Sequence, residues 1–322
     1  EFRRVLFRSH GERVLDDYAL STLVCDVRPR TGRLSFALNR AETTHATWRH
    51  PAVREMACVP VVSGDDVRAW LIAINHRGGS DSHEFGAIEI RLLDSIAAIL
   101  SIHSNNSRLF RRQGDLFVSS VSALASAIDA KDRYTSGHSD RVARLSVCLA
   151  EQLGLGKSEL DVIYLGGLLH DIGKIGIDDL VLNKPGDLTD EEFQHIKLHP
   201  TLGYDILKGV RPLEKILPIV LHHHEAWNGR GYPHGLNGEQ TPLLARIVAV
   251  ADSFDAMTSS RPYRDGMPVE RVEKIFRDEA GSQWDPAVVG AYFARRDDFR
   301  KIAAGAPDQP RGRTIDPTTW IQ

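Results

Sequence analysis

Residues 170–177 read His-Asp-Ile-Gly-Lys-Ile-Gly-Ile, and this stretch lies in the middle of the region that decides the fold. On both sides of it, over residues 120–292, the sequence forms a long series of helical segments with no convincing strand pattern. We therefore predict an all-α helical bundle here. Within it, residues 170 and 171 place an imidazole and a carboxylate next to apolar packing residues.

Potential metal ligands extend outward from this stretch in both directions. They are His138, His170, Asp171, His199, the run His222-His223-His224, Asp252 and Asp255. A single histidine on an amphipathic helix is usually structural, but so many on several helices are hard to explain that way. Burying ionisable groups is costly unless they pair or bind cations. Imidazole and carboxylate without thiolate favour iron, manganese or another borderline divalent ion over a structural zinc.

Several motifs together resemble the HD-GYP family of metal-dependent phosphohydrolases in order and spacing. They are HDIGKIGI (170–177), LNKPGDLTDEEF (182–193), His199-Pro200, HHEAWNGRGYP (223–233) with its Gly231-Tyr232-Pro233, and ADSFDAMTSSRPYR (251–264). The resemblance covers roughly residues 120–290. It implies an HD-domain helical bundle that hydrolyses cyclic di-GMP.

The resemblance also implies a two-metal site. His138, His170, Asp171 and Asp252 correspond to the ligands of one ion, and Asp171, His199, His223 and His224 to those of the second, with Asp171 bridging. Two cations about 3.5–4 Å apart can hold a shared hydroxide and orient a phosphodiester for in-line attack. A bound metal lowers the pKa of its water, so no separate general base is needed. We expect two divalent ions, iron or manganese.

Five further residues are expected to bind substrate. Lys174, three residues after Asp171, is assigned to the scissile phosphate, where its charge offsets negative charge in transfer; the alternative is a surface lysine. Arg261 and Arg264 match family positions that contact phosphate and guanine; the alternative is a solvated face. Tyr232 and Pro233 lie in a shaped loop, where Tyr232 either faces a guanine or braces the loop.

The sequence departs from the family pattern at a few positions. Tyr134 stands where some members carry a Glu that helps to hold a third metal, and tyrosine is a poor ligand at neutral pH. We therefore predict a binuclear site. Asp178 replaces the usual Pro after HDIGKIGI, and His222 is an extra histidine that we interpret as supporting or structural.

The N-terminal part has a different organisation. Residues 1–9 look like an adapter-derived, non-native segment, the alternative being a frayed basic terminus. Short β-prone runs at 21–28, 33–38, 57–63 and 67–75, with the following helix, resemble the C-terminal part of a GAF domain. The predicted organisation is residues 1–9, a partial α/β GAF-like sensor at 10–103, a connecting helix at 104–119, the catalytic domain at 120–300 and a disordered tail at 301–322.

The connecting helix has apolar residues at alternating three- and four-residue steps. This helical pattern begins at Glu84, before the connecting helix itself, and its apolar residues include Leu92, Ile96, Ile99, Phe110 and Phe117, with polar residues filling the seam between them. One interpretation is a parallel homodimer connector that transmits the state of the sensor. The other is a helix packed on its own domain, with a break at residues 105–107 or at Gly114.

Charge, hydropathy and cysteine content limit the ligands and the cellular location that we expect. A net charge of −3 gives no basic field, so duplex nucleic acid is not an expected ligand. No apolar stretch approaches the ~20 residues that span a bilayer. Three widely spaced cysteines exclude a disulfide framework and suit a reducing cytoplasm, which is the expected location.

The expected reaction is hydrolysis of cyclic di-GMP to pGpG and/or GMP in bacterial second-messenger signalling. Two alternatives stay open: an HD phosphohydrolase acting on another cyclic nucleotide or dinucleotide, and a catalytically silent cyclic di-GMP receptor. Turnover measured against a panel of cyclic nucleotides would distinguish the first alternative from cyclic di-GMP hydrolysis. Binding of cyclic di-GMP without turnover in metal-loaded protein would establish the second.

Overall fold

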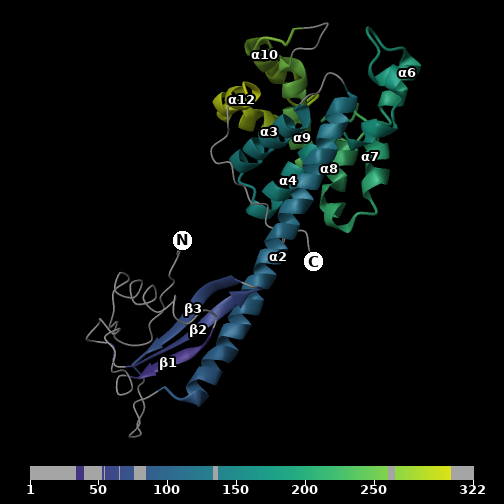
Figure 1. The fold of residues 1–322 in the computed structure, drawn as a ribbon. Coiled ribbons are helices and arrows are strands. Elements are labelled where there is room, and N and C mark those ends of the chain that lie inside the picture. The colour runs from purple at the N-terminus through teal and green to yellow at the C-terminus, as the bar shows by residue number, and fades with distance from the viewer. Residues whose placement is uncertain are drawn as a thin grey trace. The chain divides into compact units, whose positions relative to one another are not determined.

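The computed structural model describes residues 34–39, 53, 55–64, 66–75, 85–132, 137–259 and 265–305. The chain divides into two compact units, residues 1–109 and 110–322 (Figure 1). Several sequence expectations fall outside the described residues. They concern residues 1–9, the strand at 21–28, Tyr134, Arg261, Arg264 and most of the tail.

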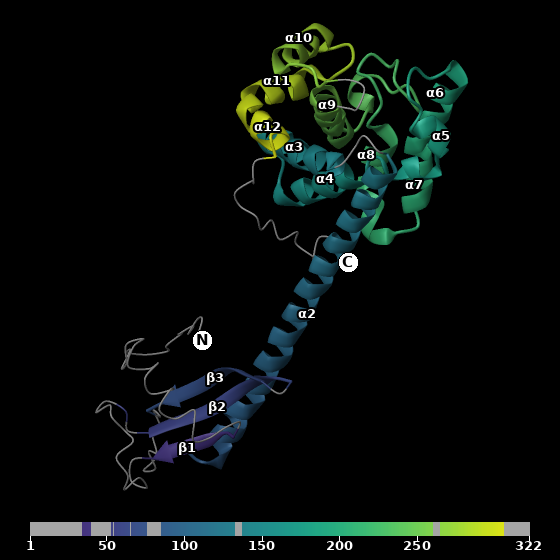
Figure 2. The same cartoon turned by 45° about the horizontal axis from the view of Figure 1, so that its top comes forward.

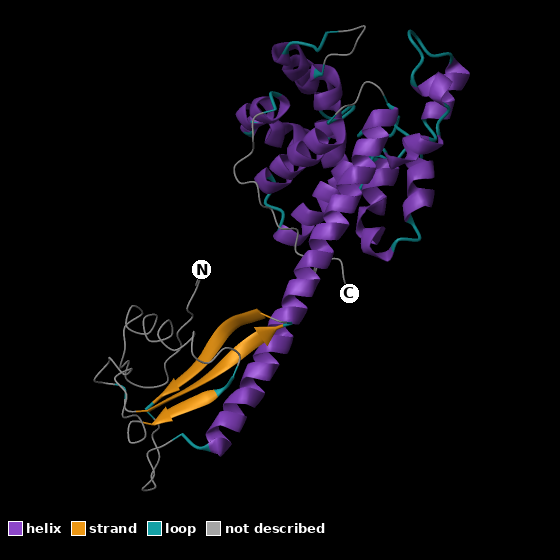
Figure 3. Ribbon diagram, in the orientation of Figure 1, coloured by secondary structure: helices purple, strands orange, loops and turns teal. Residues whose placement is uncertain are grey.

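The first unit contains a three-stranded antiparallel sheet in the order β1-β2-β3 (Figure 3). Its strands are β1 (Phe36–Asn39), β2 (Glu55–Ser63) and β3 (Asp66–Ile74). Gly64 has a φ of 60°, a conformation that glycine adopts without steric cost, at the turn between β2 and β3. The predicted β2–β3 pair is confirmed. A three-stranded sheet packed on a helix is shared by many α/β domains, so it does not establish a GAF-like domain.

Helix α2 (Ala87–Lys131) contributes to both units. In the first unit, its Ala97 is buried against Val59 and Val61 of β2. The helix continues without interruption through residues 105–107 and Gly114, so the breaks considered in the sequence are absent. No helix in the described part of the chain, this one included, is both long and apolar enough to cross a bilayer.

The second unit is helical, as predicted. Its elements are α3 (His138–Gln152), α4 (Lys157–Leu169), η1 (Ile172–Gly176), α5 (Asp179–Leu182), α6 (Asp190–Ile196), α7 (His199–Leu207), η2 (Arg211–Ile216), α8 (Leu217–His222), η3 (Gly238–Gln240), α9 (Leu243–Thr258), α10 (Val269–Glu279), α11 (Pro286–Ala294) and α12 (Arg296–Ala303). Figure 2 shows α8 and α9 between the α10–α12 group and the α5–α7 group. Helix α12 passes the predicted domain end at residue 300, because Ile302 is buried in the core.

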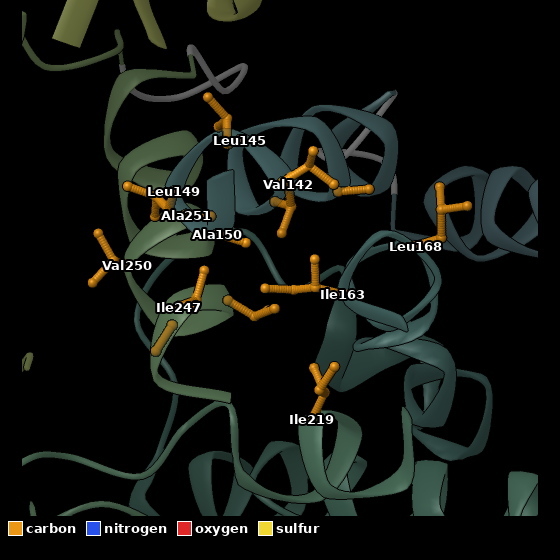
Figure 4. Close-up of a cluster of buried hydrophobic side chains, with 14 of the residues drawn as sticks. Val142, Leu145, Leu149, Ala150, Ile163, Leu168, Ile219, Ile247, Val250 and Ala251 are labelled. Carbon is orange, nitrogen blue, oxygen red and sulfur yellow. The ribbon is translucent and has the colours of Figure 1, made fainter. Parts of the chain in front are cut away.

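Helix α9 lies at the centre of the second unit and is apolar on most sides. A helix with this pattern is expected to be buried. It packs against α3, α4 and α8, and Figure 4 shows side chains of these four helices gathered in one core. Leu145, Ile163, Ile219 and Ile247 are fully buried there. This core fixes α3, α8 and α9, each of which carries polar side chains of the site described next.

Candidate metal centre

Seven His and Asp side chains converge in the second unit as two adjacent groups. One group contains His138, His170 and Asp252, and the other contains Asp171, His199, His223 and His224. Within each group, one potential ligand atom from each residue lies within 4.8 Å of the others. These are the seven residues that the sequence predicts as ligands, in the predicted division, except that Asp171 falls in the second group alone.

The contacts of Asp171 connect the two groups. Its Oδ2 atom lies 3.4 Å from His170 Nε2 and 3.8 Å from His138 Nε2. Its Oδ1 atom lies 3.3 Å from His199 Nε2 and 3.9 Å from His223 Nε2. One carboxylate oxygen therefore faces each group, which is the arrangement that a bridging ligand requires.

Three of the histidines are oriented by their own helix ends. His170 and His223 follow the last turns of α4 and α8, and His199 begins α7. In each, Nδ1 lies 2.8–2.9 Å from the carbonyl oxygen of the residue three positions earlier. Because a carbonyl only accepts, Nδ1 carries the proton and Nε2 presents its lone pair to the centre. A metal-binding histidine is commonly held in this way.

His138 is oriented differently, by a carboxylate. Its Nδ1 lies 2.8 Å from Asp255 Oδ2, and its Nε2 lies 3.2 Å from Asp252 Oδ1. Arg141 Nε donates to Asp255 Oδ1 over 2.6 Å and Arg141 Nη2 to Oδ2 over 2.9 Å, so the buried carboxylate is held from both sides. Asp255 thereby fixes the ring of His138.

We expect Asp255→Asn to weaken metal binding about 10–100-fold, because losing such a hydrogen bond behind a ligand typically has that effect. The measurement is metal affinity by competition with a chelator. The exposed Asp278 on α10 supplies a matched Asp278→Asn control. Equal affinities for the two variants would show that Asp255 does not position His138.

The two groups differ electrostatically. Burial lowers the pKa of His138, but hydrogen bonds to Asp252 and Asp255 outweigh it and raise the value to about 10. Burial, together with the nearby His199, lowers the pKa of His224 to about 3. Burial would raise the pKa of Asp171, yet Lys174 and His170 hold it well below its usual range. In the metal-free protein, His138 therefore retains a proton that a cation has to displace, whereas His224 is already neutral.

Lys174 lies at the edge of the centre, on the short helix η1. Its Nζ is 2.7 Å from Asp171 Oδ2 and 3.0 Å from Asp132 Oδ2. Burial would lower the pKa of Lys174, but the two carboxylates raise it, so the ammonium is retained. Lys174 is thus a partly buried cation that is paired beside the centre, and not a solvated surface lysine.

Residues 229–233 form a loop and no helix, as predicted. The ring of Tyr232 stacks on His224, with centroids 4.8 Å apart and an interplanar angle of 23°. A Cβ on Gly231 would lie 2.5 Å from the His224 carbonyl oxygen, so only glycine allows the loop to approach this closely. Pro233 follows Tyr232 in the loop and is half-buried. The stack supports the bracing interpretation of Tyr232 without excluding contact with a base.

Sequence reasoning missed some of the residues that support the centre. Asp132 had no signal, since it lies 42 residues before Lys174. Asp255 was named as a potential ligand, since it lies one helical turn after Asp252, but it was given no role. Asp178, whose role was open, is the N-cap of α5, and its side chain accepts the Leu180 N–H at 2.8 Å.

The residues fit divalent cations. His170 Nε2 is buried without a hydrogen-bond partner, and it is directed at Asp171 and Asp252. Such an orphaned atom costs free energy unless something binds it. A set of imidazoles and carboxylates without thiolate suits iron, manganese and similar ions.

Comparison with known proteins identifies the family of the helical unit. The sequence profile of the HD domain matches residues 122–288, which is just over half of the chain. The chain therefore belongs to the HD-domain family.

Several curated phosphodiesterases are similar to this chain in sequence. The chain is 42% identical over 184 residues to the cyclic di-GMP phosphodiesterase response regulator RpfG of Xanthomonas campestris pv. campestris, covering 56% of this chain and 49% of that protein. It is 40% identical over 186 residues to a cyclic di-GMP phosphodiesterase of Thermotoga maritima, covering 57% and 50%. It is 34% identical over 249 residues to the 3'3'-cGAMP-specific phosphodiesterase 2 of Vibrio cholerae, covering 74% and 48%. The chain thus spans about half the length of these relatives.

Proposed function

We propose that the protein is a metal-dependent phosphodiesterase of the HD-GYP type that hydrolyses cyclic di-GMP to pGpG and/or GMP. The observation that carries the proposal is the convergence of seven side chains into two adjacent groups. Asp171, a member of the second group, directs one carboxylate oxygen at each of them. The names of the relatives from Xanthomonas and Thermotoga support the substrate. Two divalent cations, iron or manganese, are the proposed cofactors, and bacterial second-messenger signalling in the cytoplasm is the proposed setting.

Bound at this centre, two cations would supply Lewis acidity and a water of lowered pKa. His138 and His170 with Asp252, and His199 with His223 and His224, would hold them, and Asp171 would serve both. The Nδ1–H bonds to backbone carbonyls keep three of the rings in the binding tautomer. The protein therefore provides a preorganised ligand set that requires little rearrangement.

We assign Lys174 to the scissile phosphate. Its ammonium is partly buried and fixed by Asp171 and Asp132, so it is a positive charge at a defined place beside the centre. Negative charge that develops on a phosphoryl group is stabilised by such a preorganised cation. Tyr232, Pro233, Arg261 and Arg264 stay proposed contacts to the guanine bases and phosphates.

The names of other relatives suggest a cyclic dinucleotide other than cyclic di-GMP as an alternative substrate. Relatives of this chain include 3'3'-cGAMP-specific phosphodiesterases from Vibrio cholerae. Another cyclic dinucleotide is therefore the alternative substrate, and a silent cyclic di-GMP receptor is the alternative of another class.

A substrate panel tests the proposal. Protein purified anaerobically and loaded with Mn²⁺ or Fe²⁺ is incubated with cyclic di-GMP, 3'3'-cGAMP and cyclic di-AMP, and the products are identified by mass spectrometry. We expect the fastest turnover for cyclic di-GMP. Faster turnover of 3'3'-cGAMP would reassign the substrate, and binding of cyclic di-GMP without turnover would identify a receptor.

We further propose that the N-terminal unit is a partial GAF-like sensor and that α2 forms a parallel homodimer. Ile99, Ile102, Leu109 and Leu116 are 59–66% exposed and repeat at intervals of three and seven residues along one face of α2. Large apolar residues exposed in such a row are typical of a coiled-coil seam.

Ile102→Lys is expected to shift the protein from dimer to monomer in light scattering after size-exclusion chromatography, because it places a charge in the proposed seam. The matched control is Ser104→Lys, which adds the same charge at an exposed position on another face of the helix. A wild-type monomer, or equal effects of both variants, would contradict a dimer through α2.

A further inference from the structure

A third group of potential ligands lies outside the centre. It contains His222 at the end of α8, Glu225, and His234 in the loop that follows Tyr232 and Pro233. One potential ligand atom from each lies within 4.8 Å of the others. The rings of His222 and His234 have centroids 5.3 Å apart, and His222 Nδ1 lies 3.4 Å from Glu225 Oε1. We infer that His222, Glu225 and His234 form a separate, exchangeable site for a zinc-like divalent cation.

The carboxylate of this group is preorganised. The Glu225 side chain is fully buried, and its Oε1 and Oε2 accept the backbone N–H groups of His234 at 2.9 Å and Leu236 at 3.0 Å. A carboxylate oxygen has two lone pairs, so each one can bind a cation while it accepts one of these hydrogen bonds. Glu225 therefore loses little freedom when a cation binds.

The histidines make the group accessible. His234 is exposed, and the His222 side chain is 14% exposed, so a cation can enter from solvent without opening the core.

The donor set determines the kind of cation. Two imidazoles and one carboxylate suit borderline divalent ions such as Zn²⁺, Co²⁺, Ni²⁺ and Fe²⁺, whereas Mg²⁺ and Ca²⁺ prefer oxygen donors. Three protein ligands leave at least one position for water, as in open zinc sites. With few ligands and partial exposure, the ion exchanges with solvent, in contrast to the ions of the buried centre.

The group lies at both ends of the loop whose Tyr232 stacks on His224. His222 directly precedes the predicted ligands His223 and His224, and His234 comes two residues after Tyr232, which stacks on His224. A cation that joins His222 to His234 thus fixes both ends of this loop. The consequence is a loop whose opening depends on the concentration of a zinc-like ion, whether or not the protein turns over cyclic di-GMP.

Metal counting tests the site. Untagged protein is dialysed against buffered free Zn²⁺ in the low micromolar range, and zinc per chain is measured by mass spectrometry. We expect His234→Gln and His222→Gln each to bind one zinc ion fewer than the wild type. The control is His103→Gln, which removes an exposed histidine of α2 that belongs to none of the three groups found among the described residues, and it should bind as many as the wild type. Equal counts for wild type and His234→Gln would overturn the inference.

Hydrogen exchange gives a second readout that does not need turnover. Zn²⁺ should slow amide exchange in the peptide covering residues 225–236 more strongly in the wild type than in His234→Gln, because the amides of His234 and Leu236 are bonded to Glu225. Equal slowing in both proteins would contradict the site. Absence of cyclic di-GMP hydrolysis would instead affect only the proposed function.

Discussion

Asp171→Ala is expected to bind neither cation of the centre and to lose hydrolysis by on the order of a thousand-fold or more. Asp171 presents one oxygen to each ligand group, so its removal takes a ligand from both ions at once. It also removes one of the two ion pairs of Lys174 seen among the described residues and leaves the one with Asp132. Metal content is measured after loading with Mn²⁺ in the absence of zinc. The rate of hydrolysis is measured as an initial rate in Mn²⁺.

Asp187→Ala is the matched control, because Asp187 is exposed in a nearby loop of the same unit. It should retain both ions and the wild-type rate. Asp171→Asn, which keeps the shape of the side chain, separates a loss of charge from a packing defect and should also lose both ions. Full activity of Asp171→Ala would show that the site is wrongly assigned.

Gly173→Ala is expected to destabilise the protein by about 3 kcal/mol, the upper end of the usual cost of overpacking. A Cβ at this position would lie 1.9 Å from the carbonyl oxygen of His199 and 2.5 Å from the backbone nitrogen of Gly203. Both are backbone atoms that cannot turn aside, so η1 and α7 must separate. Since these elements carry Asp171 and His199, the second ligand group would open.

The free energy of unfolding by urea measures this effect, together with metal content at a temperature where the variant is folded. Gly290→Ala provides the comparison, because a Cβ there meets no atom within 4 Å in α11. Replacing a helical glycine by alanine without a clash should stabilise by up to about 1 kcal/mol. If Gly173→Ala were as stable as Gly290→Ala, the close packing of η1 on α7 would be incorrect.

Much of the helical unit could be predicted from the sequence, and so could the convergence of seven His and Asp side chains in it. The seven predicted ligands belong to motifs whose order and spacing are distinctive. The seven fall into two groups, which differ from the predicted division only in that Asp171 belongs to the second group alone. The supporting residues were harder to predict, because the ion pair between Asp132 and Lys174 depends on how distant segments pack.

Other features depended on geometry that no local pattern encodes. The common Nδ1 contacts of His170, His199 and His223 require each histidine to lie where its ring reaches the carbonyl three residues earlier. His222 was interpreted as a supporting residue, and its proximity to His234 becomes visible only when the loop folds back. The roles of Arg261 and Arg264 stay predictions.

Anomalous diffraction from crystals loaded with Mn²⁺ or Fe²⁺ is the most direct test of the two-metal centre. We expect two strong peaks in the second unit, one within reach of His138, His170 and Asp252 and the other within reach of His199, His223 and His224. Asp171 should coordinate both. A single peak, or two peaks that do not share Asp171, would contradict the account.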